Sequence, residues 1–199
     1  MTDRRFALAM IAPVAALSLS ACGVNSVPTA EEEAKAKWAD VQAAYQRRAD
    51  LIPNLVETAR GASQIEKSTL EGVIQARASA TQVQLNADDL NDPAKVQAFQ
   101  QAQGNVSSAL GRLLVTVEQY PQLQSQARFA DLMTQLESTE NRVNISIRDY
   151  NEAVRAYNTR IRTFPDAIGA KVIYGAKPMT PYQAVTPNAN VAPKVNFGQ

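Results

Sequence analysis

One stretch of the sequence, residues 126–164, limits the possible folds more than any other. Large apolar residues recur in it at intervals of seven: Phe129, Leu136, Val143, Tyr150, Tyr157 and Phe164. A second series, offset by four, consists of Met133, Glu140, Ile147, Val154 and Ile161, and no glycine or proline interrupts either series. A sustained heptad favours a coiled-coil-like helix with a narrow seam against partner helices. The pattern predicts one helix over residues 126–164, about 58 Å long.

Three further helices are predicted before it, over residues 30–61, 64–86 and 93–119, from apolar stripes at helical spacing. Their start signals are a Thr29–Glu32 capping box, a Ser63–Glu66 capping box and an Asp92-Pro93 pair. The connections between them are short, which makes consecutive helices antiparallel neighbours. The sequence therefore predicts an all-α fold, a long antiparallel up-down four-helix bundle.

Pro53 lies inside the first predicted helix. Because proline has no N–H, the carbonyl of Ala49 loses its helical partner, and the helix is expected to bend there.

The composition changes after Phe164. Residues 165–199 contain five of the ten prolines and only four charged side chains, which predicts an extended Pro-rich C-terminal tail that is partly disordered. Its first part, residues 167–174, is apolar enough to fold back on the bundle.

The N-terminus ends an apolar run with Leu19-Ser20-Ala21-Cys22, and Cys22 is the single cysteine of 199 residues. Arg4 and Arg5 precede the run, as in a secretory signal peptide. The motif resembles a lipobox, which implies cleavage between Ala21 and Cys22 and acylation of Cys22 with groups such as palmitate. An ordinary signal peptide with a coincidental cysteine is the alternative, and the run is shorter than the roughly 20 residues of a membrane span.

The predicted organisation is a lipoprotein signal peptide over residues 1–21, a tether over 22–29, a bundle domain over 30–165 and a tail over 166–199. Gly23 follows the cysteine, where an aspartate often marks inner-membrane retention in Gram-negative lipoproteins. The resemblance therefore implies outer-membrane sorting, facing the periplasm, if the source is Gram-negative.

The composition excludes several kinds of chemistry. Histidine is absent, and the one cysteine is expected to be acylated, so the usual zinc, haem and iron–sulfur ligand sets and the histidine-based nucleophile systems are excluded. Without the signal peptide the acidic and basic residues balance, which argues against nucleic-acid binding. We predict no catalytic residues, no metal and no cofactor. A remote alternative is a hydrolase that uses Glu137 and Glu140, three residues apart on one helix.

Two charged residues occupy seam positions that the repeat would give to apolar ones. Glu140 does so near the middle of the last helix, and Arg48 does so near the middle of the first. Antiparallel packing places them at the same level, so we predict an ion pair that fixes the register. Exposure of one or both, or a catalytic role for the carboxylate, are the alternatives.

Polar residues also repeat every seven beside the seam. Asn144, Asn151 and Asn158 are expected to form interhelical hydrogen bonds near the hydroxyls of Tyr150 and Tyr157. Arg148, Arg155 and Arg162 fit a solvated face, or a docking strip for an acidic partner.

Several short stretches together resemble the LemA family of bacterial envelope proteins: residues 45–58, Tyr120-Pro121, residues 139–142, Tyr150-Asn151, Tyr157-Asn158 and Phe164-Pro165. The resemblance implies a long-helix bundle, usually tethered by an N-terminal membrane segment, which the lipobox replaces here. It supplies no catalytic residues. It adds Pro53, Asn54 and Asn141 to the candidate structural or interaction residues.

These observations lead to a functional hypothesis. The chain is interpreted as a non-enzymatic scaffold or adaptor in the bacterial cell envelope, bound to the membrane through acyl groups on Cys22 and to an unknown envelope protein. The alternative is a self-associating structural or membrane-remodelling protein, a homo-oligomer joined through the last helix.

Overall fold

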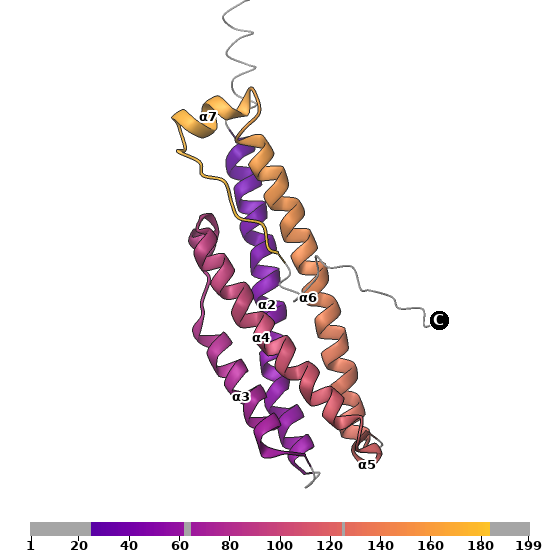
Figure 1. The fold of residues 1–199 in the computed structure, drawn as a ribbon. Helices are drawn as coiled ribbons and strands as arrows, with labels where there is room; N and C mark the ends of the chain where they lie inside the picture. The colour runs from indigo at the N-terminus through magenta and orange to yellow at the C-terminus, as the bar shows by residue number, and fades with distance from the viewer. Residues whose placement is uncertain (1–24, 62–64, 125, 184–199) are drawn as a thin grey trace, which may run out of the picture.

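The computed structural model describes residues 25–61, 65–124 and 126–183, and every regular element within them is helical. Four long helices alternate in direction along a common axis (Figure 1): α2 (Ser26–Arg60), α3 (Lys67–Gln82), α4 (Pro93–Val117) and α6 (Ala127–Arg160). Three short elements connect or follow them: the 3₁₀ helix η1 (Ala87–Asn91), α5 (Pro121–Gln124) and α7 (Asp166–Val172). The predicted all-α up-down bundle is confirmed.

The bundle is built from two helix pairs of unequal length. α2 packs mainly on α6, and α3 packs mainly on α4. Because α2 and α6 have 35 and 34 residues while α3 and α4 have 16 and 25, the first pair extends past the second at the end where α2 begins (Figure 1).

The helix boundaries depart from the sequence signals at several points. The predicted Thr29 capping box is wrong, because α2 begins at Ser26 and the Thr29 hydroxyl instead donates to the Asn25 carbonyl at 2.7 Å. α3 ends at Gln82, four residues early, and η1 occupies part of an expected loop. Ser63 lies outside the described residues.

Asp92 caps α4 as predicted. Its carboxylate accepts hydrogen bonds from the backbone amides of Ala94, at 2.9 Å, and Lys95, at 3.4 Å, and Pro93 takes the first helical position. The cap therefore satisfies two of the amides that have no partner within the helix.

α2 continues through Pro53, and the carbonyl that the proline cannot bond has a partner from another helix. The Arg77 side chain on α3 donates its Nε–H to the Ala49 carbonyl at 2.6 Å. The missing helical bond is thus replaced by a bond that joins α2 to α3.

The buried apolar residues form two clusters, one at each end of the bundle. The aliphatic half is dominated by Ile, Leu and Val from α2, α3, α4 and α6, with Ile52, Val73, Leu113 and Leu136 among its members. The aromatic half lies toward the start of α2 and contains Trp38, Tyr45, Phe99, Tyr150, Tyr157 and Tyr182. Between them lies a polar layer around Arg48, Gln103 and Glu140.

The prediction of an extended tail is wrong for residues 166–172, which are helical, but the first part of the tail does fold back on the bundle as expected. Residues 166–172 form α7, which buries Ala170 and packs on α2. Gly175, with a φ of 56°, then turns the chain, a backbone conformation that suits glycine after a helix end. Residues 176–183 run back along the bundle in an extended form (Figure 1), and we name them the return segment. Among the described residues, no helix has both the length and the apolar character needed to cross a bilayer.

Candidate functional site

The return segment is held by asparagine side chains of α6. The Asn151 amide donates to the Tyr182 carbonyl at 2.8 Å and accepts from the Tyr182 N–H at 2.7 Å. Asn158 makes the same pair with Met179, at 2.8 and 2.9 Å. A carboxamide offers one donor side and one acceptor side, so each asparagine bonds a peptide backbone as a neighbouring β-strand would.

Two tyrosines alternate with these asparagines. The Tyr150 hydroxyl donates to the Thr180 carbonyl at 2.9 Å, and the Tyr157 hydroxyl donates to the Lys177 carbonyl at 3.1 Å. On the other side, the Thr180 N–H donates to the carbonyl of Leu90 in η1 at 2.8 Å. We call the four α6 residues Tyr150, Asn151, Tyr157 and Asn158 the Asn–Tyr row.

The spacing of the row matches an extended chain. Asn151 and Asn158 are two helical turns apart, about 10.5 Å. Met179 and Tyr182 are three residues apart, and three residues of extended chain span roughly 10 Å. Asn158 bonds Met179, whereas Asn151, earlier in α6, bonds Tyr182, later in the chain. The return segment therefore runs antiparallel to α6.

This arrangement corrects one expectation. The asparagines were predicted to bond between helices, but Asn151 and Asn158 bond the return segment, and Asn144, one step earlier in the repeat, is exposed. The heptad marked these residues as a series. It could not identify the partner, because that partner lies in a segment without a periodic pattern.

Two side chains of the return segment are anchored in the aromatic half. Met179 and Tyr182 are buried, and the hydroxyls of Tyr182 and Tyr45 lie 2.5 Å apart. Burial raises the pKa of Tyr45, with the facing Tyr182 hydroxyl as the next cause, and burial also raises the pKa of Tyr150 and Tyr182. These hydroxyls therefore stay protonated at neutral pH, as donors must.

Arg48 is the centre of the polar layer and is 2% exposed. Its Nη1 donates to a carboxylate oxygen of Glu140 at 3.0 Å and to the Ser107 hydroxyl at 2.9 Å, and its Nη2 donates to the side-chain oxygen of Gln103 at 2.6 Å. The guanidinium also stacks over the Tyr45 ring, 4.8 Å from its centre. The two seam charges thus meet at one level, where they join α2, α4 and α6.

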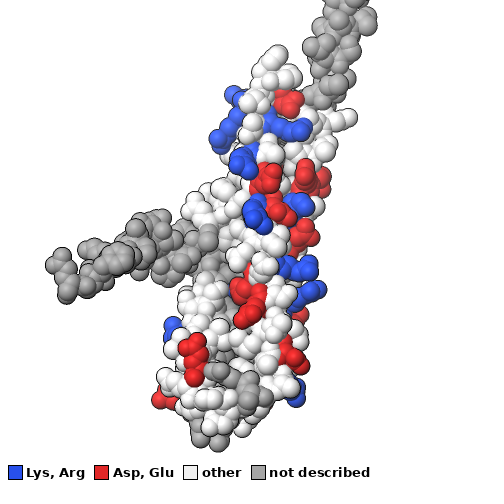
Figure 2. Space-filling view, turned by 90° about the vertical axis from the view of Figure 1, so that its right-hand side faces the viewer, with Lys and Arg blue, Asp and Glu red and all other residues white. Residues whose placement is uncertain are grey.

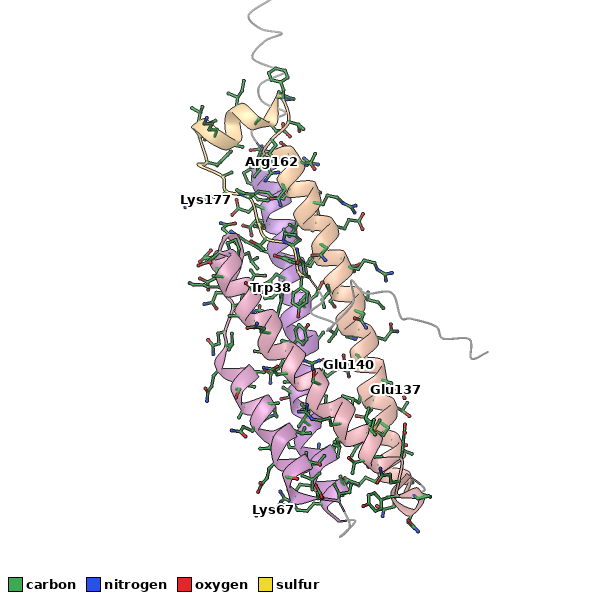
Figure 3. All side chains as sticks on the ribbon, viewed as in Figure 1. Trp38, Lys67, Glu137, Glu140, Arg162 and Lys177 are labelled. Carbon is green, nitrogen blue, oxygen red and sulfur yellow. The ribbon has the colours of Figure 1, made fainter. Side chains whose placement is uncertain are left out.

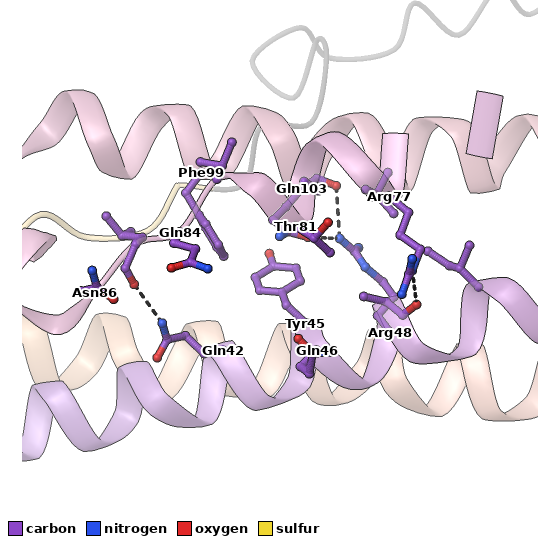
Figure 4. A pocket seen from close by; sticks show the side chains of 16 residues that line it. Gln42, Tyr45, Gln46, Arg48, Arg77, Thr81, Gln84, Asn86, Phe99 and Gln103 are labelled. Atoms are coloured by element: carbon purple, nitrogen blue, oxygen red, sulfur yellow. Dashed lines mark hydrogen bonds between the residues drawn. The ribbon is translucent and has the colours of Figure 1, made fainter. Parts of the chain in front are cut away.

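A cavity of about 210 Å³ lies beside Arg48, between α2, α3 and α4 (Figure 4). Both arginines that line it already have partners, Arg48 in the polar layer and Arg77 on the Ala49 carbonyl. The cavity is also smaller than the roughly 300 Å³ at which small-molecule sites begin. Its two cationic side chains are therefore accounted for by the fold.

The two carboxylates of the hydrolase alternative do not form a pair. Both lie on α6 (Figure 3), but Glu140 bonds Arg48, whereas Glu137 is exposed and lines a different shallow cavity with Glu118. No cluster of three acidic or cysteine side chains that could bind a metal occurs in residues 25–61, 65–124 and 126–183.

The remaining candidates are spread over the molecule. Pro53, Asn54 and Asn141 are exposed, and the Asn54 carbonyl accepts from the Thr58 hydroxyl at 2.8 Å. Arg148 and Arg155 are exposed on α6, and Arg162 is exposed just after its end, on a surface where acidic and basic side chains are interspersed (Figure 2). Ala21 and Cys22 lie outside the described residues.

The sequence did not identify several residues that hold the return segment or the loop between α3 and η1. Trp38 donates its indole N–H to the Leu85 carbonyl at 3.0 Å, and the Gln42 amide bonds the same carbonyl at 2.8 Å. Tyr182 was not singled out either. A tyrosine among prolines in an otherwise polar tail was the available signal.

Comparison with known proteins gives a family. The model of the LemA family matches residues 37–197, a span that contains both the Asn–Tyr row and the return segment. The magnetosome proteins MamQ 1 and MamQ 2 of Paramagnetospirillum magneticum are each 28% identical over 174 residues, covering 79% of this chain and 64% of theirs. Protein LemA of Metamycoplasma hominis is 25% identical over 124 residues, covering 62% of this chain and 52% of its own. The chain thus spans less than two thirds of the length of these relatives.

Proposed function

The chain belongs to the LemA family, and we propose that it acts as a lipid-anchored, non-enzymatic scaffold of the bacterial cell envelope. In this proposal acyl groups on Cys22 attach the protein to a membrane, the outer membrane facing the periplasm in a Gram-negative cell. The bundle then presents a binding face to segments of other envelope proteins.

The observation that carries the scaffold role is the way the Asn–Tyr row holds a peptide. All six of its hydrogen bonds go to backbone groups of residues 177–182. Backbone contacts do not depend on the side-chain sequence of the bound segment. The same row therefore suits an extended segment of another protein when the return segment is displaced.

The anchor is supported by the sequence motif at Cys22 and by the short distance along the chain from Cys22 to the start of α2. Asn25 is three positions after Cys22, and three residues of chain span at most about 10 Å. Acylation at Cys22 would hold the start of α2 close to the lipid surface, and more than one acyl chain makes such attachment stable.

The experiment is site-specific photo-crosslinking in cells of the source species. A photoreactive residue at Asn144, which is exposed seven residues before Asn151 on α6, is expected to capture a defined envelope protein. The same residue at exposed Ile74 on α3 serves as the control position. Captured protein that is identical at both positions, or absent at Asn144, contradicts the scaffold role.

Self-association has less support. The seam residues of α6 that could join two chains, such as Leu136, Val143 and Tyr150, are buried within their own bundle. Light scattering of the detergent-extracted protein tests this alternative, and a monomer counts against it.

A further inference from the structure

The exposed large apolar side chains are concentrated at one end of the molecule. Eight such side chains occur among the described residues, and five of them lie within residues 164–174: Phe164, Ile168, Val172, Ile173 and Tyr174. Phe164 is 83% exposed and Val172 is 78% exposed. Soluble surfaces rarely gather apolar side chains in this way unless something covers them.

α7 presents part of this patch as one face. Ile168 and Val172 are four residues apart, so they lie one above the other on the helix, while Ala170 is buried against the bundle. The helix is therefore fixed to the bundle by one side and presents its apolar side outward. We call the five residues the α7 apolar patch.

The patch lies at the end of the bundle where α2 begins (Figure 1). The end of α6 is beside that start, since the Arg160 guanidinium lies 3.5 Å from the Ser26 carbonyl. Cys22 is four residues before Ser26. The patch and the acylated residue of the proposed function would consequently be at the same end.

Most charged residues near the patch are basic, which suits a surface that contacts lipid headgroups. Within residues 160–177 the exposed cations are Arg160, Arg162, Lys171 and Lys177, and the one acid is Asp166. Figure 2 shows basic side chains gathered toward this end of the molecule. The glutamates of α2 at residues 31–33 begin about 7.5 Å further along the bundle from Ser26, and two of them pair with Lys35.

We infer that the α7 apolar patch is a membrane-seating surface, which inserts Ile168, Val172 and the neighbouring aromatic and aliphatic side chains into the headgroup boundary of the bilayer that holds Cys22. This inference rests on the proposed lipid anchor and adds to it a second contact. An acyl anchor alone lets the rod swing freely, whereas an anchor with an inserted face fixes its orientation and keeps the Asn–Tyr row at a defined distance from the lipid.

The test uses the full chain, purified as the membrane-bound form and reconstituted in phosphatidylethanolamine–phosphatidylglycerol vesicles. Cys22 is the sole cysteine and its thiol is acylated in the proposed function, so a cysteine introduced by Val172→Cys is the one thiol that an environment-sensitive fluorophore can label. Ile168→Cys provides a second probe position if the first variant misfolds. Val115→Cys on α4, where the native side chain is 62% exposed, is the matched control.

Brominated acyl chains in the vesicles are expected to quench the label at position 172 at least threefold more than the label at position 115. Equal quenching at the two positions, with the protein still bound to vesicles, overturns the seating surface and leaves the anchor intact. A label at 172 that is shielded from aqueous iodide but not quenched by bromine overturns it in favour of contact with a second copy of the chain. A mass spectrum of the N-terminal peptide without acyl groups refutes the anchor and, with it, this inference.

Discussion

The two halves of the bundle reach the same degree of burial by different means. The aliphatic half is enclosed by four helices, and side chains of ordinary size fill the space between them. In the aromatic half the pair α2 and α6 extends past α3, so fewer helices enclose the core (Figure 1). There, larger rings and the return segment complete the burial. A core that has lost a helix can thus be closed by an extended segment, provided that its backbone groups find partners.

The polar partners of the two halves differ for the same reason. A helix satisfies its own backbone, so the aliphatic half needs few polar side chains. An extended segment does not, and the Asn–Tyr row supplies the missing bonds from α6. In the described residues, every buried side-chain nitrogen or oxygen has a hydrogen-bond partner.

The largest expected effect comes from removing the central ring of the aromatic half. Trp38 is buried against Phe99 and Tyr150, with ring centres 5.4 and 5.2 Å away, and it bonds Leu85. We expect Trp38→Ala to lower the free energy of unfolding by about 3–5 kcal/mol. Circular dichroism during urea unfolding measures the loss.

The control for that change is Leu113→Ala in the aliphatic half, which is expected to cost about 2–5 kcal/mol. Hydrogen exchange separates the two variants, because only Trp38→Ala should accelerate exchange in residues 177–182. Equal acceleration in both variants would show that the halves do not differ in what they hold.

The second expected effect concerns the polar layer between the halves. Glu140→Leu leaves the buried Arg48 charge without its carboxylate and should cost about 3 kcal/mol. Arg48→Met should cost less, because Glu140 is 37% exposed and can turn to water. The double variant is expected to lose about 1–3 kcal/mol less than the sum. Additive losses in urea unfolding would rule out a coupled pair.

The third prediction uses alkaline pH to act on the aromatic half. Burial raises the pKa of Tyr45 and Tyr182, so the unfolded chain releases these protons first as the pH passes about 10. Their contribution to stability is complete below that pH and is lost as the pH rises, by about 1 kcal/mol per tyrosine between pH 10 and 11. Thermal melts should show a shallower alkaline decline for the variant with both tyrosines changed to phenylalanine. Parallel pH profiles would contradict this.

The smallest expected effect tests the row itself. Asn158→Ala removes two hydrogen bonds to Met179 and should cost about 1–2 kcal/mol, with faster amide exchange confined to the return segment. Asn144→Ala, in the same heptad series but exposed, should stay within about 0.5 kcal/mol of the parent. If the amides of the return segment exchange at the same rate in both variants, the Asn–Tyr row does not hold the segment.

The heptad predicted α6 to within four residues at its end, and the Asp92-Pro93 pair placed the start of α4. These signals are local, because capping and periodicity act within one or two turns. The sequence also predicted that Arg48 and Glu140 lie at the same height along the bundle, since antiparallel helices of similar length align their midpoints. The prediction that Thr29 caps the first helix was also wrong for a local reason. The helix extends back to Ser26, and Asn25 precedes it without a side-chain cap.

The sequence by itself determined that this chain forms long antiparallel helices, because the seven-residue repeat leaves one continuous seam to bury. Only the tertiary structure decided that residues 166–172 form α7 and that residues 176–183 lie on α6. Neither segment has a periodic pattern, and the partners of the return segment lie about 20–30 residues away in the chain and on η1. Its position depends on which backbone groups the shorter helices leave accessible, a property of the folded bundle that no stretch of residues contains alone.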